Sequence, residues 1–76
     1  MKELIEYLVH SLVDYPEQVT LSIEEEDGNV TMQLTVAQDD LGKVIGKNGT
    51  TINAMRTVVQ AAASSRGKRV RLDIGG

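Results

Sequence analysis

Hydrophobic residues recur with two different spacings along this chain. Spacings of three and four residues, which place side chains on one face of a helix, run through residues 2–14 and 50–63. Strict alternation with polar residues, which gives a strand one buried face, occurs in three further stretches. The predicted strands are residues 19–25, 30–36 and 68–74.

Residues that break or turn the backbone separate these stretches. Pro16 lies just past the first helical pattern and prevents its continuation. The sequence Glu26-Asp27-Gly28-Asn29 predicts a tight turn in which Gly28 takes a positive φ. The first two strands should therefore form an antiparallel hairpin. The segment 64–67 ends the long helix, and Gly75-Gly76 is predicted to be a loose end.

A second, shorter apolar stretch lies between the hairpin and the long helix. Residues 41–45 predict a short helix, with Asp39 or Asp40 placed to cap its first turn. A loop follows at residues 46–49, and Thr50 or Thr51 could cap the next helix. The predicted order is α-β-β-α-α-β.

This order predicts an α/β two-layer sandwich formed by one domain. A three-stranded sheet would carry the helices on one face and leave Thr, Ser, Gln, Glu and Arg on the other, wet face. The connection between the last two strands contains two helices, which is compatible with a parallel strand pair and a mixed sheet. A chain of 76 residues leaves room for one small core.

The 46–49 loop has the residues of an anion site. Gly46 can adopt the left-handed conformation that ends a helix, and Gly49 removes side-chain bulk where the next helix starts. Lys47 adds a cation beside the free N–H groups of that helix. A nucleotide-hydrolysing P-loop is excluded, because Gly42 and Gly46 are separated by three residues rather than four and Asn48 follows Lys47 in place of Ser or Thr.

Charge divides the chain into two halves. The formal net charge is −3, yet residues 1–40 carry ten acidic residues and one basic one, a net charge of −9. Residues 41–76 carry seven basic residues and one acidic one, a net charge of +6. This asymmetry indicates a basic working face on an acidic protein; the alternative is that charge simply varies along a short chain.

Other chemistries find little support. There is no cysteine, and His10, the one histidine, has no evident catalytic partner, so no enzyme is predicted. The acidic run from Glu24 to Asp27 indicates a solvated hairpin tip rather than a metal site. No apolar run approaches the ~18 residues of a membrane span and no signal peptide opens the chain, so a cytoplasmic protein without cofactors is expected.

The stretch from Val44 to Ile52, VIGKNGTTI, resembles the V-I-G-x-x-G-x-x-I signature of KH domains. The signature lies between two predicted helices with a strand after them, and the element order is similar to the type II, prokaryotic KH fold. The resemblance covers residues 1–76 as a single KH domain and extends to small bacterial proteins that consist of one such domain.

The resemblance implies that the chain binds single-stranded RNA; the residues do not distinguish RNA from single-stranded DNA. Phosphates would be clamped by Gly46, Lys47, Asn48 and Gly49. Lys43 and Arg56 would be flanking cations. Val44, Ile45 and Ile52 would line an apolar groove for bases, unless they pack in the core. The basic cluster formed by Arg66, Lys68, Arg69 and Arg71 either extends the phosphate track or is a solvated strand edge.

The resemblance also implies a role as an RNA chaperone or post-transcriptional regulator. Its implied partners are a second copy of the chain, giving a homodimer, or a larger KH-containing protein, giving a heterodimer. The strongly acidic first half leaves one alternative: an adaptor for other proteins that keeps the KH scaffold with weak or no RNA binding.

Overall fold

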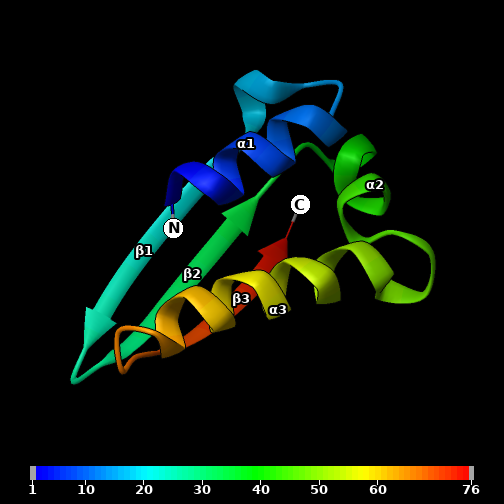
Figure 1. The fold of residues 1–76 in the computed structure, drawn as a ribbon. Coiled ribbons are helices and arrows are strands. Elements are labelled where there is room, and N and C mark those ends of the chain that lie inside the picture. Colours follow the sequence, from blue (N-terminus) through cyan, green and yellow to red (C-terminus); the bar gives the residue numbers. More distant parts are fainter. Residues whose placement is uncertain (1, 76) are drawn as a thin grey trace.

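A computed structural model describes residues 2–75 and confirms the predicted element order (Figure 1). The order is α1, β1, β2, α2, α3 and β3, with single 3₁₀ turns at Pro16–Gln18, Gln38–Asp40 and Lys47–Gly49. The bounds are α1 Lys2–Leu12, β1 Thr20–Glu26, β2 Asn29–Thr35, α2 Leu41–Ile45, α3 Thr50–Ser64 and β3 Arg69–Gly75.

The three strands form one mixed sheet in the order β1-β2-β3. β1 and β2 are antiparallel, and the turn between them holds both Asp27 and Gly28 at positive φ, 52° and 80°. β2 and β3 are parallel because the chain crosses the sheet through α2 and α3 before it returns. Gly75 is not a loose end, since it pairs with Thr35 and its carbonyl accepts the Val36 N–H at 3.1 Å. Gly76 lies outside the described residues.

The helices lie together on one face of the sheet, and the core fills the space between the two layers (Figure 1). The central strand β2 alternates buried and exposed residues along its whole length, as a strand covered on one face should. Two helices and the outer strand β3 complete the layer. The buried hydrophobic residues are Ile5, Val9, Val30, Met32, Leu34, Val36, Ala37, Val44, Ile52, Met55, Val59, Ala63 and Leu72.

The outer strand β1 is less covered than its sequence pattern predicts. Ile23 was expected in the buried face, but it is 40% exposed, and Leu21 is half-buried. The helices extend over β2 and β3 more fully than over this edge of the sheet (Figure 1). Alternation fixes which way a side chain points, whereas coverage depends on where the helices pack.

Asp40 joins the end of α1 to the start of α2. Its carboxylate accepts the backbone N–H of Asp14 at 3.0 Å and that of Tyr15 at 2.9 Å, and its Oδ1 lies 3.5 Å from Nζ of Lys43. Asp40 is fully buried, and no side chain caps α2, so the predicted capping role of Asp39 or Asp40 was wrong. These bonds hold the chain after Leu12 in an irregular path, which accounts for the end of α1 before residue 14.

The surroundings of Asp40 stabilise its ionised form. Burial alone would raise the pKa of this carboxyl, but the N–H groups of Asp14 and Tyr15 and the charge of Lys43 outweigh it, so the pKa lies below the ordinary 3.8. A carboxyl with a lowered pKa stabilises the fold above its unfolded pKa of about 3.9. That contribution is lost as the pH falls through the folded-state pKa.

Replacing Asp40 with Asn should lower the thermal stability. One amide oxygen cannot serve both N–H groups as the two carboxylate oxygens do, and the attraction to Lys43 disappears. We expect the midpoint of thermal unfolding at pH 7, followed by circular dichroism, to fall by about 5 °C or more. The difference from the unaltered chain should shrink as the pH is lowered below about 4.

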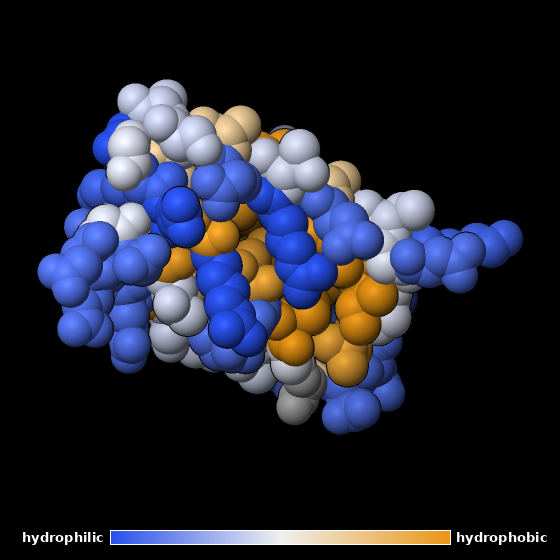
Figure 2. All heavy atoms as spheres, turned by 90° about the horizontal axis from the view of Figure 1, so that it is seen from below, coloured by the Kyte–Doolittle hydropathy of each residue, from blue (hydrophilic) through white to orange (hydrophobic). Residues whose placement is uncertain are grey.

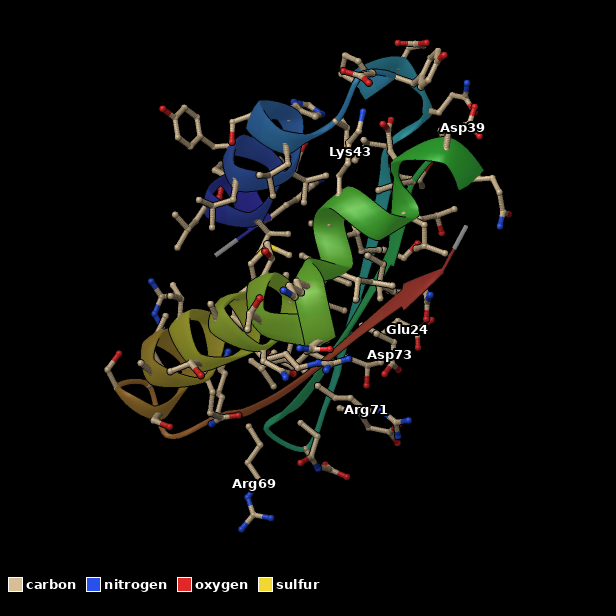
Figure 3. All side chains as sticks on the ribbon, turned by 90° about the vertical axis from the view of Figure 1, so that its right-hand side faces the viewer. Glu24, Asp39, Lys43, Arg69, Arg71 and Asp73 are labelled. Carbon is tan, nitrogen blue, oxygen red and sulfur yellow. The ribbon has the colours of Figure 1, made fainter. Side chains whose placement is uncertain are left out.

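Asp39→Asn is the matched control for this prediction, because Asp39 is the exposed neighbour of Asp40 (Figure 3). It removes the same charge and should leave the midpoint almost unchanged. Equal midpoints for the two variants at pH 7 would show that Asp40 does not tie α1 to α2.

Candidate nucleic-acid interface

The connection between α2 and α3 is a tight loop held by its own backbone. Gly46, which follows α2, has φ 78° and ψ 173°, and the turn Lys47–Gly49 comes next. Asn48 and Gly49 both take left-handed conformations, with φ of 57° and 76°. The Gly49 N–H bonds the Gly46 carbonyl at 3.2 Å, and the Thr50 hydroxyl donates to the Lys47 carbonyl at 2.8 Å.

Gly46 is required for two reasons. Its backbone angles belong to a region that only glycine occupies readily. A Cβ atom on Gly46 would also lie 2.8 Å from Cβ and 2.9 Å from the backbone N of Thr51, far inside normal contact. Gly49 is less confined, because a Cβ there would meet only Nδ2 of Asn53, at 3.5 Å. The start of α3 therefore packs directly on Gly46, closer than any side chain would allow.

The first turn of α3 has no side-chain cap. Gly49 is the residue before the helix, and the predicted caps Thr50 and Thr51 were wrong, since no side chain accepts a bond from this helix end. The Thr50 hydroxyl is used as a donor within the loop. The N–H groups at the start of α3 thus lack a side-chain acceptor, which is the electrostatic setting of an anion site.

The apolar residues around the loop belong mainly to the core. Val44 is fully buried, and Ile52 is 4% exposed; both pack in the core cluster. Ile45 is half-buried against the same cluster. The core interpretation thus holds for Val44 and Ile52, which support the loop from below rather than line a groove.

The two middle residues of the loop are exposed. Within residues 2–75, neither Lys47 nor Asn48 has a side-chain hydrogen bond or an ion pair. A loop that projects two such side chains beside an uncapped helix end can bind an anion without first breaking an internal bond.

Lys43 differs from Lys47. Its ammonium group bonds Asp14 and lies near Asp40, at the junction of α1 and α2 (Figure 3). The hydrogen bond to Asp14 raises the pKa of Lys43, which stays charged but is neutralised by its neighbours. Lys43 was predicted to flank the phosphate site as a free cation, and the structure instead places it in an ion-pair cluster.

A groove of about 610 Å³ lies between α3 and β3. Seen from below, hydrophobic residues form a continuous hollow that hydrophilic side chains border and cross (Figure 2). We call it the α3–β3 groove; it is lined by Arg56, Thr57, Val59, Gln60, Val70, Arg71, Leu72 and Asp73.

Arg56 connects the loop to this groove. Its Nε donates to the carbonyl of Leu72 on β3 at 3.0 Å, and its Nη1 donates to Oδ1 of Asn53 at 3.0 Å. Asn53 in turn lies beside Gly49. The arginine is thereby fixed at the groove entrance rather than free to follow a phosphate.

The second basic cluster is partly neutralised. Lys68 pairs with Glu25 of the hairpin at 2.7 Å, and Arg71 pairs with Asp73 at 3.1 Å. Arg69, Arg71 and Asp73 extend from β3 on the sheet side away from the helices (Figure 3). Within residues 2–75, Arg66 and Arg69 have no ion pair. A continuous phosphate track across this cluster finds limited support.

Residues 2–74 match the family model described as the KhpA/KhpB KH domain. The chain belongs to this KH-domain family. It is 54% identical to RNA-binding protein KhpA of Oceanobacillus iheyensis over 74 residues, covering 97% of this chain and 99% of that protein. Identity to proteins of the same name is 46% in Listeria monocytogenes and 45% in Chlamydia trachomatis, covering 97% of this chain and 97% and 95% of those proteins.

The expected KH resemblance is thereby confirmed, together with the α/β fold and its element order. Sequence reasoning missed the two residues that hold α3 against β3. Gln60 accepts the Val70 N–H at 3.1 Å and donates to the Ser64 hydroxyl at 3.0 Å, while Asn53 orients Arg56. Both lie on the polar side of the helical pattern, where spacing alone gives no signal.

Two further features of residues 2–75 bear on other classes of function. No three His, Cys, Asp or Glu side chains converge as a metal site in this part of the chain, and the acids of the hairpin tip instead line a solvent-filled hollow. None of its helices has the length and apolar character needed to cross a bilayer.

Gly46→Ala should destabilise the fold strongly. The added methyl group combines a backbone strain with a clash against Thr51, so we expect the free energy of unfolding to fall by about 2–4 kcal/mol in chemical denaturation. Gly42→Ala is the matched control in α2, because nothing lies within 4 Å of its Cβ position. That change should raise the free energy of unfolding by up to about 1 kcal/mol. Similar values for both variants would contradict the role of Gly46.

Proposed function

We propose that this chain is a non-catalytic protein that binds single-stranded RNA. The Gly46–Gly49 loop carries the proposal, since it presents an uncapped helix end, a free lysine and a free amide on one projecting turn. Gly46 and Gly49 let the RNA backbone approach, Lys47 supplies charge and Asn48 donates a hydrogen bond to a phosphate oxygen. The names of the KhpA relatives support RNA as the ligand.

Bases would lie in the α3–β3 groove that starts beside the loop. Its apolar walls are Val59, Val70 and Leu72, and Arg56 stands between the loop and these walls. The chain has no Phe or Trp, and its two Tyr residues lie outside the groove. Base binding therefore depends on aliphatic contact and hydrogen bonds rather than on aromatic stacking.

Affinity should be modest and sensitive to salt. The cations at the site are Lys47 and Arg56, because Lys43 is held by acidic residues. Few phosphate contacts give a shallow dependence of affinity on salt concentration and little discrimination among RNA sequences. Such binding suits an RNA chaperone or post-transcriptional regulator in the cytoplasm. Crosslinking to cellular RNA should recover many transcripts, and recovery of one stable RNA alone would contradict this role.

The double substitution Lys47→Asp with Asn48→Asp should abolish RNA binding and keep the fold. Both side chains are exposed and make no bond within residues 2–75, so their loss removes no structural contact, while two carboxylates repel phosphate. Fluorescence anisotropy with a mixed pool of single-stranded RNA should show at least about a hundredfold loss of affinity. Circular dichroism should be unchanged.

Lys2→Asp with Thr20→Asp changes the net charge equally, at exposed positions in α1 and β1 away from the loop (Figure 1). This control should keep nearly all of the affinity. If the folded loop variant binds RNA as tightly as the control, the loop is not the phosphate site. Testing the matching DNA strands in the same assay determines whether RNA is preferred.

Pairing with another KH chain would require a surface outside the α3–β3 groove. An apolar hollow of about 300 Å³ lies between α1 and α3, lined by Leu8, Leu12, Met55 and Val58 among others. Leu12 and Val58 are 38% and 43% exposed. We assign this hollow to self-association or to pairing with a larger KH-containing protein of the KhpB type, as the family description suggests.

Val58→Asp should weaken such pairing, because a carboxylate in an apolar contact loses hydration. Sedimentation equilibrium should show a shift toward monomer for the variant, with RNA affinity per site retained. If the unaltered chain is monomeric and pairs with no KH protein, the hollow has another role. Binding of a protein partner without any RNA affinity would instead favour the adaptor function.

A further inference from the structure

The guanidinium of Arg56 is held in one orientation before any ligand arrives. Its Nε is bonded to the Leu72 carbonyl and its Nη1 to Oδ1 of Asn53, both at 3.0 Å. These partners belong to β3 and to the preceding turn of α3, two elements that pack together. A planar group fixed at two of its nitrogens cannot rotate freely, so its other N–H donors have set directions.

The remaining donors stand at the entrance of the α3–β3 groove. Arg56 is an exposed residue that also lines the groove, so the free part of its fork can reach a ligand there. The nearby walls are aliphatic, formed by Val59, Val70 and Leu72. An ionic phosphate gains little from aliphatic walls, whereas the flat faces of a base lose unfavourable contact with water there.

A fixed arginine fork recognises two acceptors that lie side by side. Guanine carries such a pair in O6 and N7, the commonest specific partner of arginine. Cytosine carries one in O2 and N3. Adenine and uracil place a donor beside each acceptor on their hydrogen-bonding edges, so the fork can satisfy only one bond with them.

We propose that Arg56 reads a base rather than a phosphate, and that the groove selects a base with two adjacent hydrogen-bond acceptors. Asn53 is a positioning residue that holds the guanidinium in the reading orientation. The Gly46–Gly49 loop supplies affinity without regard to sequence, and Arg56 adds the preference at one nucleotide. This inference rests on the proposed RNA-binding function.

The test uses short uridine-rich RNA strands that carry guanosine, cytidine, adenosine or uridine at one central position. Fluorescence anisotropy with the full chain should show about tenfold tighter binding for guanosine or for cytidine than for adenosine and uridine. A strand with 7-deazaguanosine, which lacks the N7 acceptor, separates the two sources. Loss of the preference in that strand identifies guanine, and a preference for cytidine alone identifies cytosine.

Arg56→Lys keeps the positive charge but removes the fork, so it should abolish the base preference and lower the affinity for the uridine strand less than about threefold. Arg66→Lys is the control, because Arg66 has no ion pair within residues 2–75 and does not line the groove. Asn53→Ala should reduce the preference, whereas Asn53→Asp keeps an acceptor for Arg56 and should retain it.

Equal binding of all four strands, a preference for adenosine or uridine, or a preference that survives in Arg56→Lys would overturn the inference. An equal loss for every strand in Arg56→Lys would make Arg56 a phosphate contact. Failure of the proposed function is distinguishable, because then the Lys47→Asp, Asn48→Asp variant would bind every strand as the unaltered chain does.

Discussion

The close approach of Thr51 to Gly46 is the contact on which the site depends. It lets α3 start almost directly where α2 ends, with one short loop between them. The buried Val44 and Ile52 fix the two helices to the core on either side of this contact. The loop is therefore rigidly mounted although its own side chains are exposed, and the uncapped start of α3 faces outward with Lys47 beside it.

The acidic first half of the chain does structural work that leaves a small basic face exposed. Asp14 and Asp40 hold Lys43 at the junction of α1 and α2, and Glu25 holds Lys68 beside the hairpin. These pairs remove cations from the RNA surface. What remains near the groove is Lys47 at the loop and the fixed guanidinium of Arg56. An acidic protein can thus offer a local, well-defined site for a polyanion.

Periodicity was sufficient to predict the strands, the long helices, their order and the loop between glycines. It could not predict that Ile23 is exposed or that Val44 is fully buried, since burial depends on where helices pack over the sheet. Nor could it predict the partners of Asp40, because two of its bonds run to residues 25 and 26 positions away. The groove residues Asn53 and Gln60 were missed for the same reason: their role comes from α3 meeting β3.

The central claim is that RNA is held along the Gly46–Gly49 loop and the edge of β3. Titration of the isotope-labelled chain with single-stranded RNA, followed through backbone amide resonances by NMR, tests it residue by residue. The account predicts shifts concentrated at Lys47–Thr51, at the first turns of α3 and at Val70–Leu72. Shifts confined to α1, to β1 or to the outer face of the sheet, with the loop unperturbed, would contradict it.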